Sequence, residues 1–130
     1  MKHEFISYHS VAVENEFAMT VGFCRDPADD DSLDGLILER GRGEEDDTPG
    51  IKGVYVEIPI QRHVVYGGIT GATLGRDSFK LQFDAAAARE MGGFGEILVH
   101  FQVADDEFIA IRDGLRYVFK DCSCYHESNS

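Results

Sequence analysis

The sequence is poor in cysteine, proline and long apolar stretches, and it contains no tryptophan. Three cysteines in 130 residues (Cys24, Cys122 and Cys124) are too few, and odd in number, for a disulfide framework. No stretch approaches the ~20 apolar residues that a membrane-spanning helix requires. The first residues, Met1–Phe5, lack the apolar run of a signal peptide. These features, and a length typical of one domain, predict a single cytoplasmic domain without a membrane anchor.

Positive charge is also scarce. Lysine and arginine number 12 against 24 aspartates and glutamates, which gives a formal net charge of −12. A surface of this sign repels phosphate backbones, so we expect no direct nucleic-acid binding. It attracts basic proteins and accelerates their encounter with the chain, although acidity also simply keeps small proteins soluble. The charge therefore leaves two interpretations, a basic protein partner or solubility alone.

What the sequence has in abundance is alternation of apolar and polar residues with period two, which is typical of half-buried strands. This pattern predicts six strands, over residues 17–23, 36–38, 54–58, 63–66, 79–83 and 97–103. The segment His3–Val13 predicts a further N-terminal strand with a weaker signal. The stretch Gly67–Gly71 predicts a turn, because its glycine spacing matches neither a P-loop nor a dinucleotide-binding fingerprint.

Two segments predict helices. Residues 85–91 form an alanine-rich run with Asp84 as the capping residue, and two glycines end it. From about Asp106 to Phe119, apolar residues recur at helical spacing along one stripe, with Asp105 as the expected N-cap. This order of elements predicts an α+β fold: a mostly antiparallel sheet of about six strands, with the C-terminal helix packed on one face and a short second helix.

The predicted sheet has a second face, which would be open to solvent or to a partner. The domain is expected to span residues 1–120. Residues 121–130 are expected to form a flexible C-terminal tail, because they offer little to pack.

No motif assembles a catalytic centre. There is no nucleophile-elbow pattern, and Cys24 at the end of an apolar strand is expected to be a small core residue. The acidic run Asp30–Gly35 has calcium-loop spacing but lacks the closing bidentate glutamate, which favours a solvated turn. We therefore expect no catalytic residue and no cofactor.

Two metal hypotheses stay open. Cys122, Cys124 and His126 offer three ligands within five residues, but the cysteines lie closer together than in structural zinc sites. His63 and His100, with nearby acids, leave a small metal-dependent hydrolase as the enzymatic alternative. A structural or regulatory protein that forms a homodimer or larger homo-oligomer through exposed sheet edges is a further alternative.

The remaining candidates are acids and tyrosines that could meet a protein partner. Clustered carboxylates can cover a basic nuclease groove where phosphates would lie, and tyrosine is enriched at interface hot spots. Clustered acids are equally typical of a solvated surface, and tyrosines of half-buried sheet positions. The candidate partner-binding residues are Asp29, Asp30, Asp31, Asp34, Glu44, Glu45, Asp46, Asp47, Tyr55, Glu57 and Tyr66.

Several short segments, taken in order, resemble the immunity protein 10 family. The resemblance covers about His3 to Phe119, and it depends on the order and spacing of the segments. The segments are Glu14–Phe17 leading to Val21–Phe23, then Leu36–Arg40, Tyr55–Ile58, Tyr66–Ile69, Asp106–Phe108 and Leu115–Phe119.

This resemblance implies a bacterial immunity protein that is encoded beside a polymorphic toxin, stays in the cytoplasm and has no enzymatic activity. Such proteins protect the producing cell by sealing the toxin domain, which is often a nuclease. The partner expected here is a cognate toxin domain of basic character, blocked at its active site or substrate path.

Overall fold

The computed structural model describes residues 2–7, 9–14, 18–24, 35–41, 54–58, 63–120 and 122–128. These residues form ten strands and two helices. The strands are β1 (Lys2–Ser7), β2 (His9–Glu14), β3 (Ala18–Cys24), β4 (Gly35–Gly41), β5 (Tyr55–Ile58), β6 (His63–Tyr66), β7 (Ile69–Leu74), β8 (Ser78–Phe83), β9 (Glu96–Phe101) and β10 (Tyr125–Glu127). The helices are α1 (Ala85–Glu90) and α2 (Asp105–Val118).

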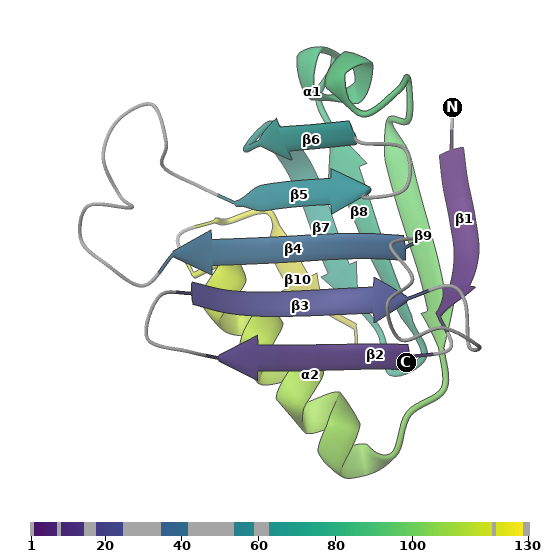
Figure 1. Ribbon diagram of the computed structural model, residues 1–130, viewed down its shortest axis with the longest axis vertical. Coiled ribbons are helices and arrows are strands. Elements are labelled where there is room, and N and C mark those ends of the chain that lie inside the picture. Colours follow the sequence, from purple (N-terminus) through teal and green to yellow (C-terminus); the bar gives the residue numbers. More distant parts are fainter. Residues whose placement is uncertain are drawn as a thin grey trace.

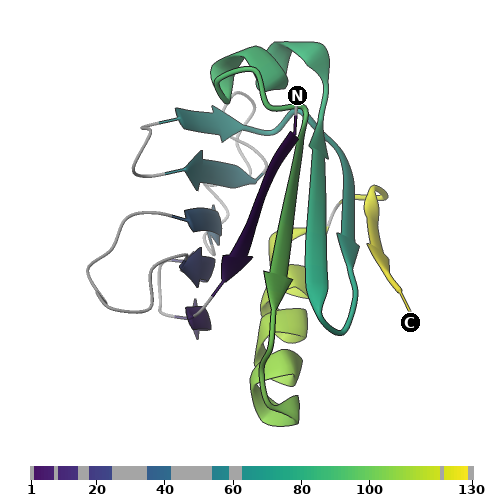
Figure 2. The same cartoon turned by 90° about the vertical axis from the view of Figure 1, so that its right-hand side faces the viewer.

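The strands of the described residues form two five-stranded sheets whose strands cross (Figures 1 and 2). Sheet I has the order β1-β9-β8-β7-β10, and sheet II has the order β2-β3-β4-β5-β6. Sheet II is antiparallel throughout, whereas in sheet I the edge strands β1 and β10 are parallel to their neighbours. Helix α2 packs on β2, β3 and β4, on the same side of sheet II as sheet I. Neither helix is long and apolar enough to cross a membrane.

The predicted α+β class, the mostly antiparallel pairing and both helices are confirmed. The strands differ in number and grouping from the single sheet of about six, because alternation reveals a strand but not the sheet that it joins. The weak N-terminal strand predicted over His3–Val13 is two strands, β1 and β2, in different sheets. The predicted turn at Gly67–Gly71 is shorter, since strand β7 begins at Ile69.

A small strand lies inside the segment 121–130, for which the sequence predicts a flexible tail. Strand β10 pairs with Ala72–Leu74 of β7. The ring of Tyr125 stacks on Phe119 with centroids 5.5 Å apart, and Arg116 holds both carboxylate oxygens of Glu127 at 2.7 and 2.8 Å. The residues that β10 contacts lie on β7 and at the end of α2. The sequence of β10 itself therefore gives no indication that it forms a strand.

The core lies between the inner faces of the two sheets and α2. Phe23 of sheet II stacks on Phe79 and Phe101 of sheet I, with ring centroids 5.8 and 5.6 Å apart. Gly114 lies where α2 meets sheet II, and a Cβ there would come within 2.9 Å of Val21 Cγ2. Glycine costs a helix about 1 kcal/mol relative to alanine, and here its lack of a side chain permits the close approach of helix and sheet.

The predicted cap of α1 is confirmed, because the Asp84 carboxylate accepts a hydrogen bond from the Ala87 N–H at 2.8 Å. For α2 the prediction was wrong by one residue, since the N-cap is Ala104 and Asp105 is the first helical residue. The Asp105 carboxylate instead pairs with Arg76 at 2.8 Å, an interaction with the β7–β8 turn.

Candidate protein-binding surface

Sheet II has an inner face, which meets sheet I and α2, and an outer face that no described helix or strand covers (Figure 1). Side chains alternate between the two faces along each strand. Val21, Leu38 and Val56 are fully buried on the inner face. Their neighbours along the chain therefore point outward.

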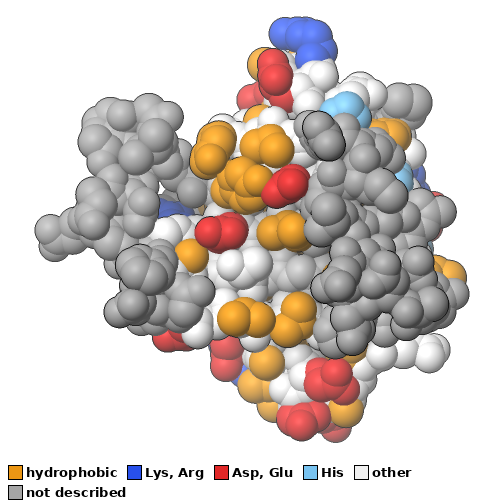
Figure 3. All heavy atoms as spheres, viewed as in Figure 1, with side chains coloured by type: hydrophobic (Ala, Val, Ile, Leu, Met, Phe, Trp, Pro, Cys, Tyr) orange, Lys and Arg blue, Asp and Glu red, His pale blue; other side chains and the backbone are white. Residues whose placement is uncertain are grey.

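The strand register arranges the outward residues in two rows across the sheet. The first row is Val13, Thr20, Glu39, Tyr55 and Tyr66, and the second is Val11, Gly22, Ile37, Glu57 and Val64. We call these residues the sheet II outer face. Hydrophobic side chains gather across this side of the molecule with acidic side chains among them (Figure 3).

The exposure of this face is greatest at its two edges. Tyr66 on edge strand β6 is 61% exposed, and Val13 on edge strand β2 is 48% exposed. Ile37 and Tyr55 on the inner strands β4 and β5 are half-buried, and so is Val64 on β6. Apolar side chains such as these offer a partner a surface whose desolvation costs little free energy.

Both charges of the sheet II outer face are negative, and they flank one tyrosine. Glu39 lies directly across from Tyr55 on the neighbouring strand, and Glu57 follows two residues later on the same strand and the same face. The Tyr55 hydroxyl donates a hydrogen bond to Glu57. Desolvation, this hydrogen bond and the nearby carboxylates together raise the pKa of Tyr55 far above its usual value.

Neither carboxylate has a cationic partner among the described residues. Tyr66 packs against Tyr55 edge to face, with ring centroids 5.2 Å apart. The next residue after Glu39, Arg40, points inward, where its buried guanidinium donates to the carbonyl of Val118 at the end of α2. The one arginine of β4 is thus used by the fold and does not neutralise the outer face.

The outer face of sheet I is different in kind, because the ionisable side chains of β1 and β9 pair with one another. Lys2 lies 3.6 Å from Glu4 and 3.8 Å from Glu96. His100 Nε2 lies 2.6 Å from Glu4 Oε2. The hydrogen bond with His100, and then the charge of Lys2, lower the pKa of Glu4.

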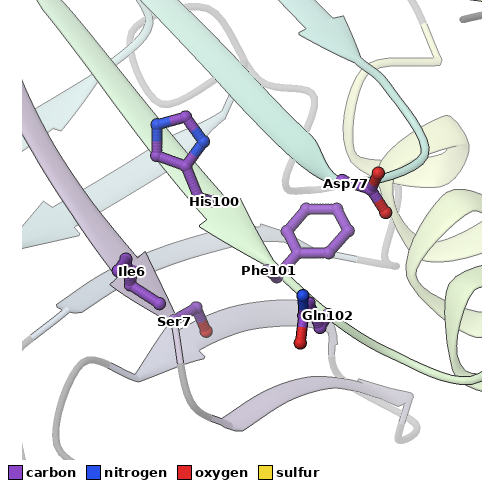
Figure 4. A pocket seen from close by; sticks show the side chains of 6 residues that line it. All are labelled: Ile6, Ser7, Asp77, His100, Phe101 and Gln102. Carbon is purple, nitrogen blue, oxygen red and sulfur yellow. The ribbon is translucent and has the colours of Figure 1, made fainter.

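A pocket of about 550 Å³ opens at the C-terminal ends of β1 and β9, beside the β7–β8 turn (Figure 4). Its lining includes Ser7, His100 and Asp77. The Ser7 hydroxyl is 2.9 Å from that of Ser10, and Ser7 is buried toward the core whereas His100 pairs with Glu4 on the outer face. Ser7 and His100 therefore lie on opposite faces of sheet I.

The histidines of the hydrolase hypothesis are not brought together. His63 lies against Gly92 at the end of α1, where a Cβ on the glycine would meet its Nε2 at 2.4 Å. His100 lies on the outer face of sheet I. Cys122 and Cys124 form a disulfide with each other, a local pairing that the argument from cysteine number did not anticipate. Within the described part of the chain, no three His, Cys, Asp or Glu side chains cluster as a metal site would need.

Of the predicted partner-binding residues, the structure brings Tyr55, Glu57 and Tyr66 together on the sheet II outer face. Sequence reasoning missed Ile37, an outward position of the strand predicted over 36–38, and Glu39, which lies just beyond that prediction in the longer β4. The other predicted residues lie outside the described ranges; they are Asp29, Asp30, Asp31, Asp34, Glu44, Glu45, Asp46 and Asp47.

Comparison with known protein families matches residues 7–109 of the chain to the family described as Immunity protein 10. No curated protein and no solved structure matches the chain. The matched range runs from the end of β1 into the first residues of α2, and it contains both rows of the sheet II outer face.

Proposed function

The chain belongs to the immunity protein 10 family, and on this premise we propose that it binds a cognate toxin domain and neutralises it. In this proposal the protein acts in the cytoplasm by occupancy and not by turnover. It covers the active site or the substrate path of the toxin, which is a basic domain such as a nuclease.

The observation that supports this function is the sheet II outer face. Protein interfaces are built around a well-packed apolar centre with tyrosine and arginine anchors. This face offers apolar side chains in two straight rows with Tyr66 at one edge, and 61% of that side chain is accessible. A rigid sheet also presents its side chains with little conformational entropy left to lose on binding.

Charge serves the same function at longer range. A net charge of −12 accelerates the encounter with a basic domain. We assign the steering to the acidic runs that include Asp29–Asp31 and Glu44–Asp47, and the short-range contacts to Tyr55, Glu57 and Tyr66. Steering raises the association rate and fades with added salt, whereas short-range contacts set the dissociation rate.

The test is to co-express the chain with the toxin domain encoded in the neighbouring gene and to purify the pair. We expect a stable one-to-one complex in which the toxin has lost its activity, and cells that survive toxin expression only when the chain is present. A toxin that stays free and active beside the folded chain would contradict the proposal.

Two further measurements separate the alternative functions. Metal analysis and a hydrolase screen of the purified chain test the enzymatic hypothesis, for which a turnover lost on His100→Ala would be the positive result. Light scattering with and without the toxin domain tests the homo-oligomer hypothesis. A stable dimer that the toxin leaves unchanged would favour self-association over inhibition.

A further inference from the structure

The proposed function leaves open which chemical group the toxin presents to the sheet II outer face. We propose that it is an arginine, whose guanidinium enters between Glu39 and Glu57 and lies against the Tyr55–Tyr66 pair. This inference rests on the proposed function and adds the chemistry of the contact.

The register places the two carboxylates where one cation can reach both. Glu39 and Glu57 are on adjacent strands and are diagonal neighbours on the same face, with Tyr55 next to each. Directly opposed side chains on a sheet have Cβ atoms about 5 Å apart, and diagonal ones about 7–8 Å apart. A guanidinium carries five N–H donors in a planar fork, so it can bind carboxylates on two sides at once.

The surroundings of the carboxylates require a cation once the face is covered. Glu39 and Glu57 are already half-buried among apolar neighbours such as Ile37 and Val64. A partner that seals the apolar rows removes the remaining water from both carboxylates, which is strongly unfavourable unless a positive group replaces it. No described side chain of this protein provides that group, and we assign it to the partner.

The tyrosines favour arginine over lysine. Tyr66 is largely exposed and meets Tyr55 edge to face at 5.2 Å, so an aromatic surface lies beside the carboxylates. Guanidinium is planar, stacks on aromatic rings and loses its weak hydration easily, whereas ammonium is a compact and strongly hydrated charge. The Tyr55 hydroxyl occupies one oxygen of Glu57, which leaves the other oxygen for the incoming donor.

The experiment measures the affinity of an inactivated toxin domain, encoded in the neighbouring gene, for charge-neutralised variants of the chain. Glu39→Gln and Glu57→Gln keep the volume of each side chain and remove one charge. Glu96→Gln, on the outer face of sheet I, removes one charge away from the proposed contact and serves as the matched control. Circular dichroism confirms that each variant is folded.

We expect the dissociation constant to rise roughly 30-fold or more for Glu39→Gln and for Glu57→Gln, because each leaves a buried guanidinium short of a partner. The control should change less than about twofold, the scale of a long-range effect. A double-mutant cycle between Glu57→Gln and Arg→Lys substitutions on the toxin surface should find one strongly coupled arginine.

Four outcomes overturn the inference. Equal losses for all three variants would show that the carboxylates only steer. Strong coupling to a lysine, with no coupled arginine, would assign the contact to the other cation. A toxin that binds tightly to Glu39→Gln and Glu57→Gln would remove this inference and leave the proposed function intact, whereas a toxin that does not bind the unmodified chain would remove both.

Discussion

Each of the two sheets has five strands, but the ionisable side chains on their outer faces have different surroundings. On sheet I, Lys2 and His100 each lie within 4 Å of Glu4. On sheet II, Glu39 and Glu57 stand among apolar side chains and meet no cation of the described residues. The ion pairs of β1 and β9 are made within the fold, whereas the described residues supply no cation to Glu39 or Glu57.

This contrast explains why acidity alone is a poor guide to the binding surface. Most exposed charges are well solvated and contribute little to either folding or binding. A carboxylate matters for recognition when the partner removes its water, and that happens at the centre of an apolar patch. By this criterion Glu39 and Glu57 differ from Glu4 and Glu96, which have partners on sheet I.

The largest expected effect on toxin binding comes from placing an arginine on the sheet II outer face. Thr20→Arg introduces a guanidinium directly opposite Glu39, where it can pair with that carboxylate and also block the approach of the toxin. We expect toxin binding to weaken about 100-fold or more, the effect of losing a hot spot. Thr73→Arg makes the same change on the outer face of sheet I and should bind like the wild type, as measured by calorimetry. Equal loss in both variants would refute the assignment of the face.

A smaller effect is expected from removing one exposed apolar side chain on each face. Tyr66 and Ile6 are comparably exposed, at 61% and 54%, on sheets II and I respectively. Tyr66→Ala should cost about 2 kcal/mol of binding free energy, or roughly 30-fold in the dissociation constant, while Ile6→Ala should leave it unchanged. Surface plasmon resonance should place the loss in the dissociation rate. A larger loss for Ile6→Ala would move the interface to sheet I.

The smallest expected effect is on the stability of the fold at acid pH, and it tests the pairing of Glu4 with His100 on sheet I. The pKa of Glu4 is lowered from 4.5 in the folded chain, chiefly by its hydrogen bond with His100. A lowered pKa means that the interaction stabilises the fold above pH 4.5 and is lost as the pH falls through the folded-state value. Urea unfolding between pH 3 and 7 should therefore show wild type and Glu4→Gln converging in acid and separating above pH 4.5. A constant difference across this range would contradict the pairing, and toxin binding should not change.

Much of the fold could be predicted from the sequence because the strands and helices carry local patterns. Alternation located β3, β5 and β8, and the alanine run with Asp84 located α1. The prediction failed where the decisive contact is distant. Tyr125–Glu127 become a strand through β7, Phe119 and Arg116, and no short window of sequence contains those partners.

The candidate site was predicted in part for the same reason. Tyr55, Glu57 and Tyr66 belong to two consecutive strands, so their proximity is nearly local. Glu39 was missed because the strand predicted there, 36–38, ends one residue before it, whereas β4 extends to Gly41. Its importance comes from lying opposite Tyr55, and that depends on the pairing of β4 with β5.

By itself the sequence determined which side of each predicted strand is apolar, because burial repeats with the period of the backbone and needs no knowledge of neighbours. Only the tertiary structure decided which outward residues form one surface and which charges are already satisfied. Glu4 finds His100 across 96 residues of chain, while Glu39 and Glu57 find no cation among the described residues. Strand order and register settle that difference, since ion pairing depends on distances of a few ångströms that the linear sequence does not contain.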